Sequence, residues 1–250
     1  MNSPKLDLSI VIPAFNEESR LPKTLESVID YLRSRPYQAE IIVVDDGSTD
    51  RTSAVVESYR QKYPGLRCVS NGGNRGKGFS VRHGMLEARG EIALFSDADL
   101  SSPIEETDKL MAAVRERNFD GAIGSRAVDR RLIQVHQSAI REMAGIFFNQ
   151  MVQWILRIKF SDTQCGFKAF RRERARIIFE QQRIEGFGFD PEILFLAQRN
   201  GLQVAEIPVR WSHDAATKVN VAADGMQMFL ELILIRWNAV RGYYPVARGW

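Results

Sequence analysis

The sequence has few cysteines and histidines and no long apolar run. Its two cysteines, Cys68 and Cys165, lack metal-like spacing, which fits free thiols in a reducing compartment and leaves one disulfide open. The three histidines show no metal-binding spacing either. The longest uncharged stretch, Met143–Leu156, is too short and too polar to cross a bilayer, and Met1–Asp7 has no signal-peptide pattern. We therefore expect a cytoplasmic protein without a transmembrane helix.

Neither sign of charge dominates the composition. Lys and Arg number 34, Asp and Glu number 31, and the net charge is +3. This excess is too small to indicate a nucleic-acid partner. With 250 residues, 44% of them hydrophobic, the chain can bury a real core. Since no linker, internal repeat or low-complexity segment interrupts it, we predict a single domain over residues 1–250.

The first half of the chain alternates short apolar segments with amphipathic ones. The predicted strands are Ser9–Phe15, Glu40–Asp46, Leu66–Ser70, Glu91–Ser96 and a segment within Asp120–Arg126. Helical spacing of apolar residues follows the first two strands. This alternation predicts an α/β, Rossmann-like fold, with a mainly parallel sheet flanked by helices. In such sheets ligands bind at the carboxyl ends of the strands.

Two acids follow the fourth predicted strand, in the sequence Asp97-Ala98-Asp99. In extended backbone the side chains of Asp97 and Asp99 point to the same side. Two carboxylates that lie so close together repel each other unless a positive group lies between them. A divalent cation such as Mg²⁺ or Mn²⁺ fits, because it takes one or two carboxylates together with phosphate oxygens. The alternative is a turn with a helix cap at Ser101 and Ser102. The two interpretations can coexist.

Asp45 and Asp46 end the second predicted strand and are followed by Gly47 and Ser48. A carboxylate at this place can accept hydrogen bonds from a nucleobase N–H or a ribose hydroxyl. The alternative is a strand-to-helix turn that is capped by Ser48 or Asp50.

The glycine-rich stretch NGGNRGKG, residues 71–78, matches neither common phosphate-binding motif. Lys77 is followed by Gly78 instead of Ser or Thr, and Val81 occupies the place of the third glycine in G-x-G-x-x-G. These departures disfavour ATP hydrolysis and dinucleotide binding. We predict a flexible turn that brings Lys77 and a helix N-terminus close to an anion.

Two strongly apolar helical segments follow in the second half, near residues 143–159 and 224–241. Trp154 and Trp237 lie beside basic residues, a pattern typical of helices in a membrane interface. Alternatively, the two helices pack together in the core or form the interface of a dimer. A homo-oligomer is therefore possible.

The ordered motifs together resemble the family 2 glycosyltransferases of the GT-A fold. They are VIPAFNEE, VVDDGSTDRT, NRGKG, FSDADLSSP, IGSR, DTQCGFKAF, GFDPEILFLA and EIPVRW, spread over roughly residues 8–240. Within this family the chain is similar to the polyprenyl-phosphate branch, the dolichyl-phosphate β-glucosyltransferases and mannosyltransferases. DTQCGFK and FD-x-E-x-L favour the glucosyl members. The resemblance implies a nucleotide-sugar-binding half, about 1–125, and an acceptor half, about 126–250.

The resemblance also implies roles for individual residues. The residues at positions that hold the nucleotide's base and ribose are Pro13, Phe15, Glu17 and Asp45. Those of the metal-binding D-x-D element are Asp97, Ala98 and Asp99. Arg126 matches an arginine that meets the phosphates. Lys218 matches the lysine of a G-x-S-K element that closes over the diphosphate, although Ala216 and Thr217 replace Gly and Ser.

The implied reaction is hexose transfer from a nucleotide sugar to dolichyl or polyprenyl phosphate, with inversion at the anomeric carbon. UDP-glucose is the favoured donor and GDP-mannose the next, and Mg²⁺ or Mn²⁺ is the implied cofactor. A phosphate monoester with a second pKa near ~6 is largely a dianion at neutral pH and needs orientation by cations more than a base. The enzyme would then lie peripherally on the cytoplasmic face of a membrane.

Three alternatives remain at this point. The first is a family 2 glycosyltransferase that acts on a sugar hydroxyl of a glycolipid or polysaccharide. In that case Asp190, in the region where hydroxyl-accepting relatives keep their base, becomes an obligatory catalytic base. The second is a nucleotidyltransferase that makes sugar nucleotides. The third is a non-catalytic module that binds a nucleotide or a lipid.

Overall fold

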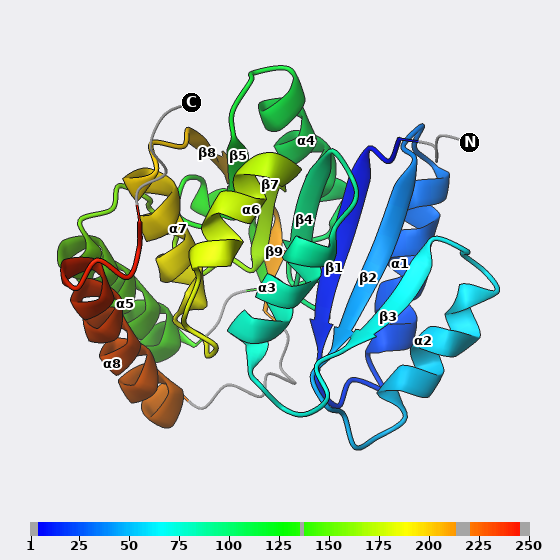
Figure 1. Cartoon of the computed structure of the whole chain (residues 1–250), viewed down its shortest axis with the longest axis horizontal. Coiled ribbons are helices and arrows are strands. Elements are labelled where there is room, and N and C mark those ends of the chain that lie inside the picture. Colours follow the sequence, from blue (N-terminus) through cyan, green and yellow to red (C-terminus); the bar gives the residue numbers. More distant parts are fainter. Residues whose placement is uncertain (1–4, 136–137, 214–220, 246–250) are drawn as a thin grey trace.

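A computed structural model describes residues 5–135, 138–213 and 221–245. Its centre is a seven-stranded sheet of order β3-β2-β1-β4-β7-β5-β8 (Figure 1). The strands are β1 Leu8–Ala14, β2 Ala39–Asp45, β3 Leu66–Ser70, β4 Ile92–Ser96, β5 Gly121–Ser125, β7 Phe167–Arg171 and β8 Val204–Pro208. β7 runs antiparallel to β4 and β5, and the other pairs are parallel. The predicted mainly parallel α/β sheet is confirmed.

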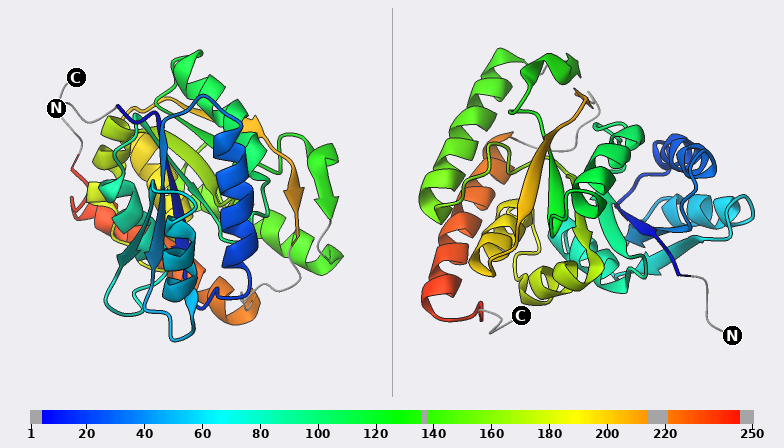
Figure 2. Two further views of the ribbon diagram at one scale, coloured as in Figure 1. Left: turned by 90° about the vertical axis from the view of Figure 1, so that its right-hand side faces the viewer. Right: turned by 90° about the horizontal axis from the view of Figure 1, so that it is seen from above.

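Helices cover both faces of this sheet (Figure 2). They are α1 Leu21–Arg33, α2 Thr52–Arg60, α3 Lys77–Glu87, α4 Thr107–Arg115, α5 Ala139–Leu156, α6 Arg172–Gln181, α7 Phe189–Arg199 and α8 Val221–Val240. Short 3₁₀ turns span Ile104–Glu106 and Arg130–Leu132, and β6 Ile133–Val135 pairs with β9 Trp211–Ser212.

The alternation of side chains along the strands creates two cores, one on each face of the sheet. In β1, Ile10 and Ile12 pack into a core with α1, α2 and α4. Val11 points to the other face and packs into a core with α3, α5, α6, α7 and α8. This is the period-two pattern of a strand that is buried on both sides.

Because β1, β2 and β4 are parallel, the segments that follow Ala14, Asp45 and Ser96 leave the sheet at one edge. β5 has the same direction, since the antiparallel strand β7 lies between it and β4. Arg126, directly after β5, therefore joins the acids of β2 and β4 at that edge.

The two predicted apolar segments are helices α5 and α8, which pack side by side at the end of the molecule away from β3 (Figure 1). Val152 and Leu232 are among the side chains that these helices bury. Their exposed large apolar residues are Met143, Ile146, Phe147, Trp154, Met226, Leu230, Ile233, Leu234, Trp237 and Val240. Within the described residues, no helix has the length and hydropathy needed to cross a bilayer.

One local prediction is wrong. Ser101 and Ser102 do not cap the following helix, since the 3₁₀ turn after Pro103 has no side-chain cap. Instead, the backbone N–H of Ser101 donates to Oδ1 of Asp99 at 2.8 Å. The serines therefore belong to a turn that Asp99 itself stabilises.

Candidate functional site

A cavity of 430 Å³ opens at the carboxyl edge of the sheet, where the sequence predicted a ligand site. The predicted site residues that line it are Pro13, Phe15, Glu17, Asp46, Lys77, Asp97, Ala98, Asp99 and Arg126. Asp45 and Asp190 are not among its lining residues. Lys218 lies outside the described residues. We call this space the donor cavity.

Asp97 and Asp99 lie on the floor of the donor cavity with one cation beside them. Nζ of Lys77 is 2.7 Å from Oδ1 of Asp97. Burial opposes the charge of Lys77, but the carboxylates of Asp97 and Asp190 outweigh burial and raise its pKa. Burial and the charge of Asp97 raise the pKa of Asp99. The wall of the cavity thus carries two carboxylates, and Lys77 is paired with one of them, Asp97.

These two acids fit a divalent cation that shares its ligands with a substrate. Among the described residues, no group of three or more His, Cys, Asp or Glu side chains is arranged to hold a metal ion alone. Burial, and after it the charge of Asp97, raises the pKa of Asp99, and a bound cation would oppose both effects. One or two carboxylates completed by phosphate oxygens and water is the ligand set that Mg²⁺ and Mn²⁺ prefer.

Asp46 shapes the NRGKG loop. Its carboxylate accepts hydrogen bonds from the backbone N–H groups of Arg75 at 2.9 Å and Gly76 at 2.8 Å. It also accepts one from Nδ2 of Asn71 at 2.7 Å. α3 begins at Lys77, so these contacts hold the N-terminus of the helix at the cavity wall. The loop thus brings Lys77 and the start of α3 to the cavity, as expected, and binding of an anion there stays a prediction.

Asp45 and Glu17 have local partners. Asp45 is buried and accepts from Ser48 N–H at 2.9 Å and Ser53 Oγ at 2.5 Å. The strand-to-helix turn that we considered for Asp45 is therefore present. Glu17 accepts two hydrogen bonds from Arg20, of 2.7 and 2.8 Å, and also lines the donor cavity.

Arg126 occupies the boundary between the donor cavity and a second, larger one. Its Nε and Nη2 donate to the two oxygens of buried Asp162, at 2.7 and 2.8 Å. Burial would raise the pKa of Asp162, but Arg126 lowers it to about 2. The guanidinium also lies over the ring of Trp211, 5.3 Å from its centroid. Asp162 and Trp211 thus fix the direction of Arg126.

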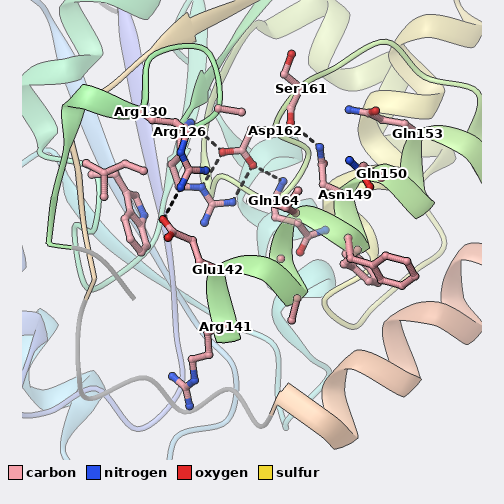
Figure 3. A pocket seen from close by; sticks show the side chains of 18 of the residues that line it. Arg126, Arg130, Arg141, Glu142, Asn149, Gln150, Gln153, Ser161, Asp162 and Gln164 are labelled. Carbon is pink, nitrogen blue, oxygen red and sulfur yellow. Dashed lines mark hydrogen bonds and ion pairs between the residues drawn. The ribbon is translucent and has the colours of Figure 1, made fainter. Parts of the chain in front are cut away.

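The second cavity has a volume of 770 Å³ and lies between α5, α8 and the segment after β5 (Figure 3). We call it the acceptor cavity. Arg126, Arg130 and Arg141 line it, and Nη2 of Arg130 donates to Glu142 at 2.7 Å. Its apolar wall consists of Ala144, Ile146, Phe147, Phe148 and Met228. Three arginines, two of them paired with Asp162 and Glu142, and apolar surface therefore share one space beside the donor cavity.

Asp190 is buried and does not line the donor cavity. Its side chain is 5% exposed and pairs with Nζ of Lys168, which is 0% exposed and also donates to the Cys165 carbonyl at 2.6 Å. Burial raises the pKa of Asp190 even though Lys168 and Lys77 oppose that effect. Among the described residues, Asp190 is in the lining of neither cavity.

Sequence reasoning did not single out Asp162, Lys168 or Trp211. All three fall within motifs that it did recognise, since DTQCGFKAF contains Asp162 and Lys168, and EIPVRW ends at Trp211. Their partners are far apart in the chain, so the motifs marked the positions without revealing the contacts.

Residues 9–178 match the model of glycosyl transferase family 2. The chain belongs to this family. It is 36% identical to the dolichyl-phosphate beta-glucosyltransferase of Homo sapiens in an alignment 254 residues long that covers 96% of this chain and 78% of that protein. The enzyme of the same name from Saccharomyces cerevisiae is 36% identical in an alignment 256 residues long that covers 95% of this chain and 76% of the relative.

Solved structures of other glycosyltransferases share the fold. Glucosyl-3-phosphoglycerate synthase from Mycobacterium tuberculosis, in complex with Mn²⁺, UDP and glucosyl-3-phosphoglycerate, superposes with a TM-score of 0.66 at 17% identity. That alignment covers 98% of this chain and 82% of the synthase. A complex of that enzyme with Mn²⁺, UDP-glucose and phosphoglyceric acid gives 0.67 at 18% identity, over 92% and 79% of the two chains. The predicted GT-A fold is confirmed, and the chain is a glycosyltransferase.

Proposed function

We propose that this glycosyltransferase transfers glucose from UDP-glucose to the phosphate of dolichol or a related polyprenol, with inversion at the anomeric carbon. One observation carries the proposal: the acidic donor cavity and the arginine-lined, apolar acceptor cavity meet at Arg126. A lipid phosphate needs both positive charge and apolar surface, and the acceptor cavity offers both. The relatives' names, dolichyl-phosphate beta-glucosyltransferase, support this acceptor.

On the donor side, Asp97 and Asp99 would hold Mg²⁺ or Mn²⁺ together with the diphosphate of the nucleotide sugar. The cation supplies positive charge that stabilises the leaving diphosphate. Lys77, already directed at Asp97, adds a fixed positive charge on the same side. Pro13, Phe15 and Glu17, which line the same cavity, would contact the base and ribose.

On the acceptor side, Arg126, Arg130 and Arg141 would orient the phosphate of the lipid. Since the phosphate is a dianion near neutral pH, it attacks without transferring a proton to the enzyme. The surroundings of Asp190 support this view, because a buried carboxylate that is paired with Lys168 and lines neither cavity is poorly placed to accept a proton from an acceptor. A sugar-hydroxyl acceptor is disfavoured for the same reason.

We propose further that α5 and α8 bring the enzyme to the cytoplasmic face of a membrane. Trp154 and Trp237 are 83% and 54% exposed on these helices. Arg241 stacks on Trp237, with 4.7 Å between its Cζ and the ring centroid. Exposed aromatic residues beside cations suit the boundary between headgroups and acyl chains. The lipid tail could then enter the acceptor cavity from the bilayer.

The test is a panel of radiolabelled nucleotide sugars with a short polyprenyl phosphate, in the presence and absence of Mn²⁺ or Mg²⁺. We expect label from UDP-glucose in an organic-extractable, mild-acid-labile product only when the metal is present. Asp97→Asn and Asp99→Asn should abolish it, whereas Asp30→Asn, an exposed acid on α1, should not. Full turnover in excess chelator, or label that moves only into a water-soluble hydroxyl product, would refute the proposal.

A further inference from the structure

The segment 184–188 lies between α8 and the NRGKG loop and contacts both. On the side of α8, Oε2 of Glu231 accepts a hydrogen bond from the backbone N–H of Gly188 at 2.7 Å. Gln227, one helical turn earlier, donates its Nε2 to Oε1 of Glu231 at 3.1 Å. Both carboxylate oxygens therefore have a donor, and the side chain is held in one direction.

The glycines of this segment make room for the carboxylate. A Cβ on Gly186 would lie 2.3 Å from Oε1 of Glu231, and a Cβ on Gly188 would lie 2.6 Å from Oε2. Any other residue would push Glu231 away from the backbone that it binds. The two glycines of GFGFD, Gly186 and Gly188, thus leave the space that the two carboxylate oxygens of Glu231 occupy.

On its other side the same segment supports the NRGKG loop. The carbonyl of Glu185 accepts from the Phe79 N–H at 3.2 Å, and its carboxylate pairs with Arg75 at 2.7 Å. A Cβ on Gly76 would lie 2.5 Å from the Glu185 carbonyl oxygen, so the two backbones are in direct contact. The loop that carries Lys77 therefore rests on this segment.

The side chains of the segment also surround Lys77 itself. Phe187 lines the donor cavity, and its ring centroid is 5.9 Å from Nζ of Lys77. The ring of Phe189, at the start of α7, lies at the same distance. Rings at this range attract an ammonium group, so the position of the segment fixes where Lys77 meets Asp97.

We propose that Glu231 is a positioning residue for donor binding: it holds the 184–188 segment against the NRGKG loop so that Lys77 faces the diphosphate. The inference rests on the proposed donor site and adds a physical connection to α8. Leu230 and Leu234, beside Glu231 on that helix, are exposed on its outward side. One helix thus presents apolar side chains outward and supports the donor cavity inward.

The test measures the binding of UDP with Mn²⁺ to the full chain by calorimetry, which needs no acceptor. Loss of the charge-assisted hydrogen bond in Glu231→Ala should weaken UDP binding about tenfold and raise KM for the donor by a similar factor. Glu231→Gln should restore affinity to within about twofold, because its amide oxygen still accepts from Gly188 N–H. The KM for the lipid acceptor should stay unchanged.

The matched control is Gln227→Ala, which leaves the bond to Gly188 and should weaken UDP binding by at most about threefold. A double-mutant cycle with Lys77→Met tests the route, since the effect of Glu231→Ala should fall below about twofold in that background. If wild-type protein binds no UDP with Mn²⁺, the donor site itself is refuted. If wild type binds and Glu231→Ala binds equally, or if the loss persists undiminished without Lys77, the positioning role is refuted.

Discussion

Lys77 and Asp97 form an ion pair on the floor of the donor cavity, with Nζ of the lysine 2.7 Å from Oδ1 of the acid. The lysine comes from the first turn of α3 and the acid from the end of β4. The positive charge of Lys77 has two opposite effects. It repels a divalent cation bound at Asp97 and Asp99, and it attracts a diphosphate. The two effects can be separated by experiment.

Lys77→Met should therefore change two affinities in opposite directions. Binding of UDP should weaken about tenfold or more, because one charge-assisted contact to the diphosphate is lost. Binding of Mn²⁺ alone should become tighter, since the two carboxylates no longer share a fixed cation. Calorimetric titrations with Mn²⁺ alone and with UDP plus Mn²⁺ measure the two values. Weaker binding of both ligands would show that Lys77 mainly supports the fold of the loop.

The sequence predicted the donor cavity better than the acceptor cavity, for a physical reason. An apolar run predicts a strand such as Glu40–Asp46. Parallel pairing then brings the polar residues that follow such strands to one edge of the sheet. The antiparallel strand β7 carries Lys168 at a fully buried position, which no local pattern distinguishes from an exposed one. The direction of Arg126 depends on Asp162, a residue far along the chain. Contacts of that kind depend on the assembled fold.

Among the acids whose pKa is raised by burial, Glu192 should make stability fall as the pH rises toward neutrality. Burial raises the pKa of Glu192 from 4.5 to about 7, although hydrogen bonds from Tyr244 and from two backbone N–H groups oppose that effect. A raised pKa means that the folded state binds more protons than the unfolded state between these two values. The contribution of Glu192 to the free energy of unfolding is fully present below about pH 4.5 and is lost as the pH passes 7. The free energy of unfolding thereby decreases by roughly 3 kcal/mol.

Tyr244→Phe is the variant that tests this assignment. The hydroxyl of Tyr244 donates to Oε1 of Glu192 at 2.6 Å and stabilises the charged form. Without it the pKa of Glu192 should rise further, so the decrease in stability should extend to higher pH. Thermal unfolding between pH 4 and 9 measures this. A pH profile identical to that of the wild-type protein would assign the decrease to another group.

Arg126 and Arg141 should differ in which substrate they serve, since Arg126 lines both cavities and Arg141 only the acceptor cavity. Arg126→Lys keeps the charge but loses the fork that binds Asp162, so KM should rise for both donor and acceptor. Arg141→Lys should raise KM for the lipid phosphate alone. Steady-state kinetics with each substrate varied in turn gives the comparison. An equal rise in donor KM for both variants would contradict the division between the cavities.

The exposed tryptophans should determine lipid attachment without affecting donor binding. Trp154→Ala together with Trp237→Ala should lower binding to liposomes by about tenfold or more, because each ring loses a largely apolar contact. Affinity for UDP with Mn²⁺ should stay the same. Co-sedimentation with vesicles and calorimetry measure the two quantities. Unchanged sedimentation combined with a smaller assembly in analytical ultracentrifugation would instead support the interpretation of α5 and α8 as the interface of a dimer.

Asp190 separates a lipid-phosphate acceptor from a hydroxyl acceptor. Asp190→Asn leaves the buried ammonium of Lys168 without its counter-ion, so it should lower the free energy of unfolding by about 3–5 kcal/mol. Transfer by the folded fraction should nevertheless fall less than in Asp97→Asn, because a phosphate dianion needs no base. Activity normalised to UDP-binding sites, with thermal unfolding in parallel, measures both effects.

The double variant Asp190→Asn with Lys168→Met removes both buried charges together and gives the sharper result. Neutral side chains of similar size in place of a buried ion pair should return much of the stability. If Asp190 acts only as the counter-ion of Lys168, this protein should transfer glucose to a polyprenyl phosphate within about tenfold of the wild-type rate, since the groups facing both cavities are retained. If it folds and binds UDP but transfers nothing, the pair acts in the reaction itself and the assignment of Asp190 as a mere counter-ion is refuted.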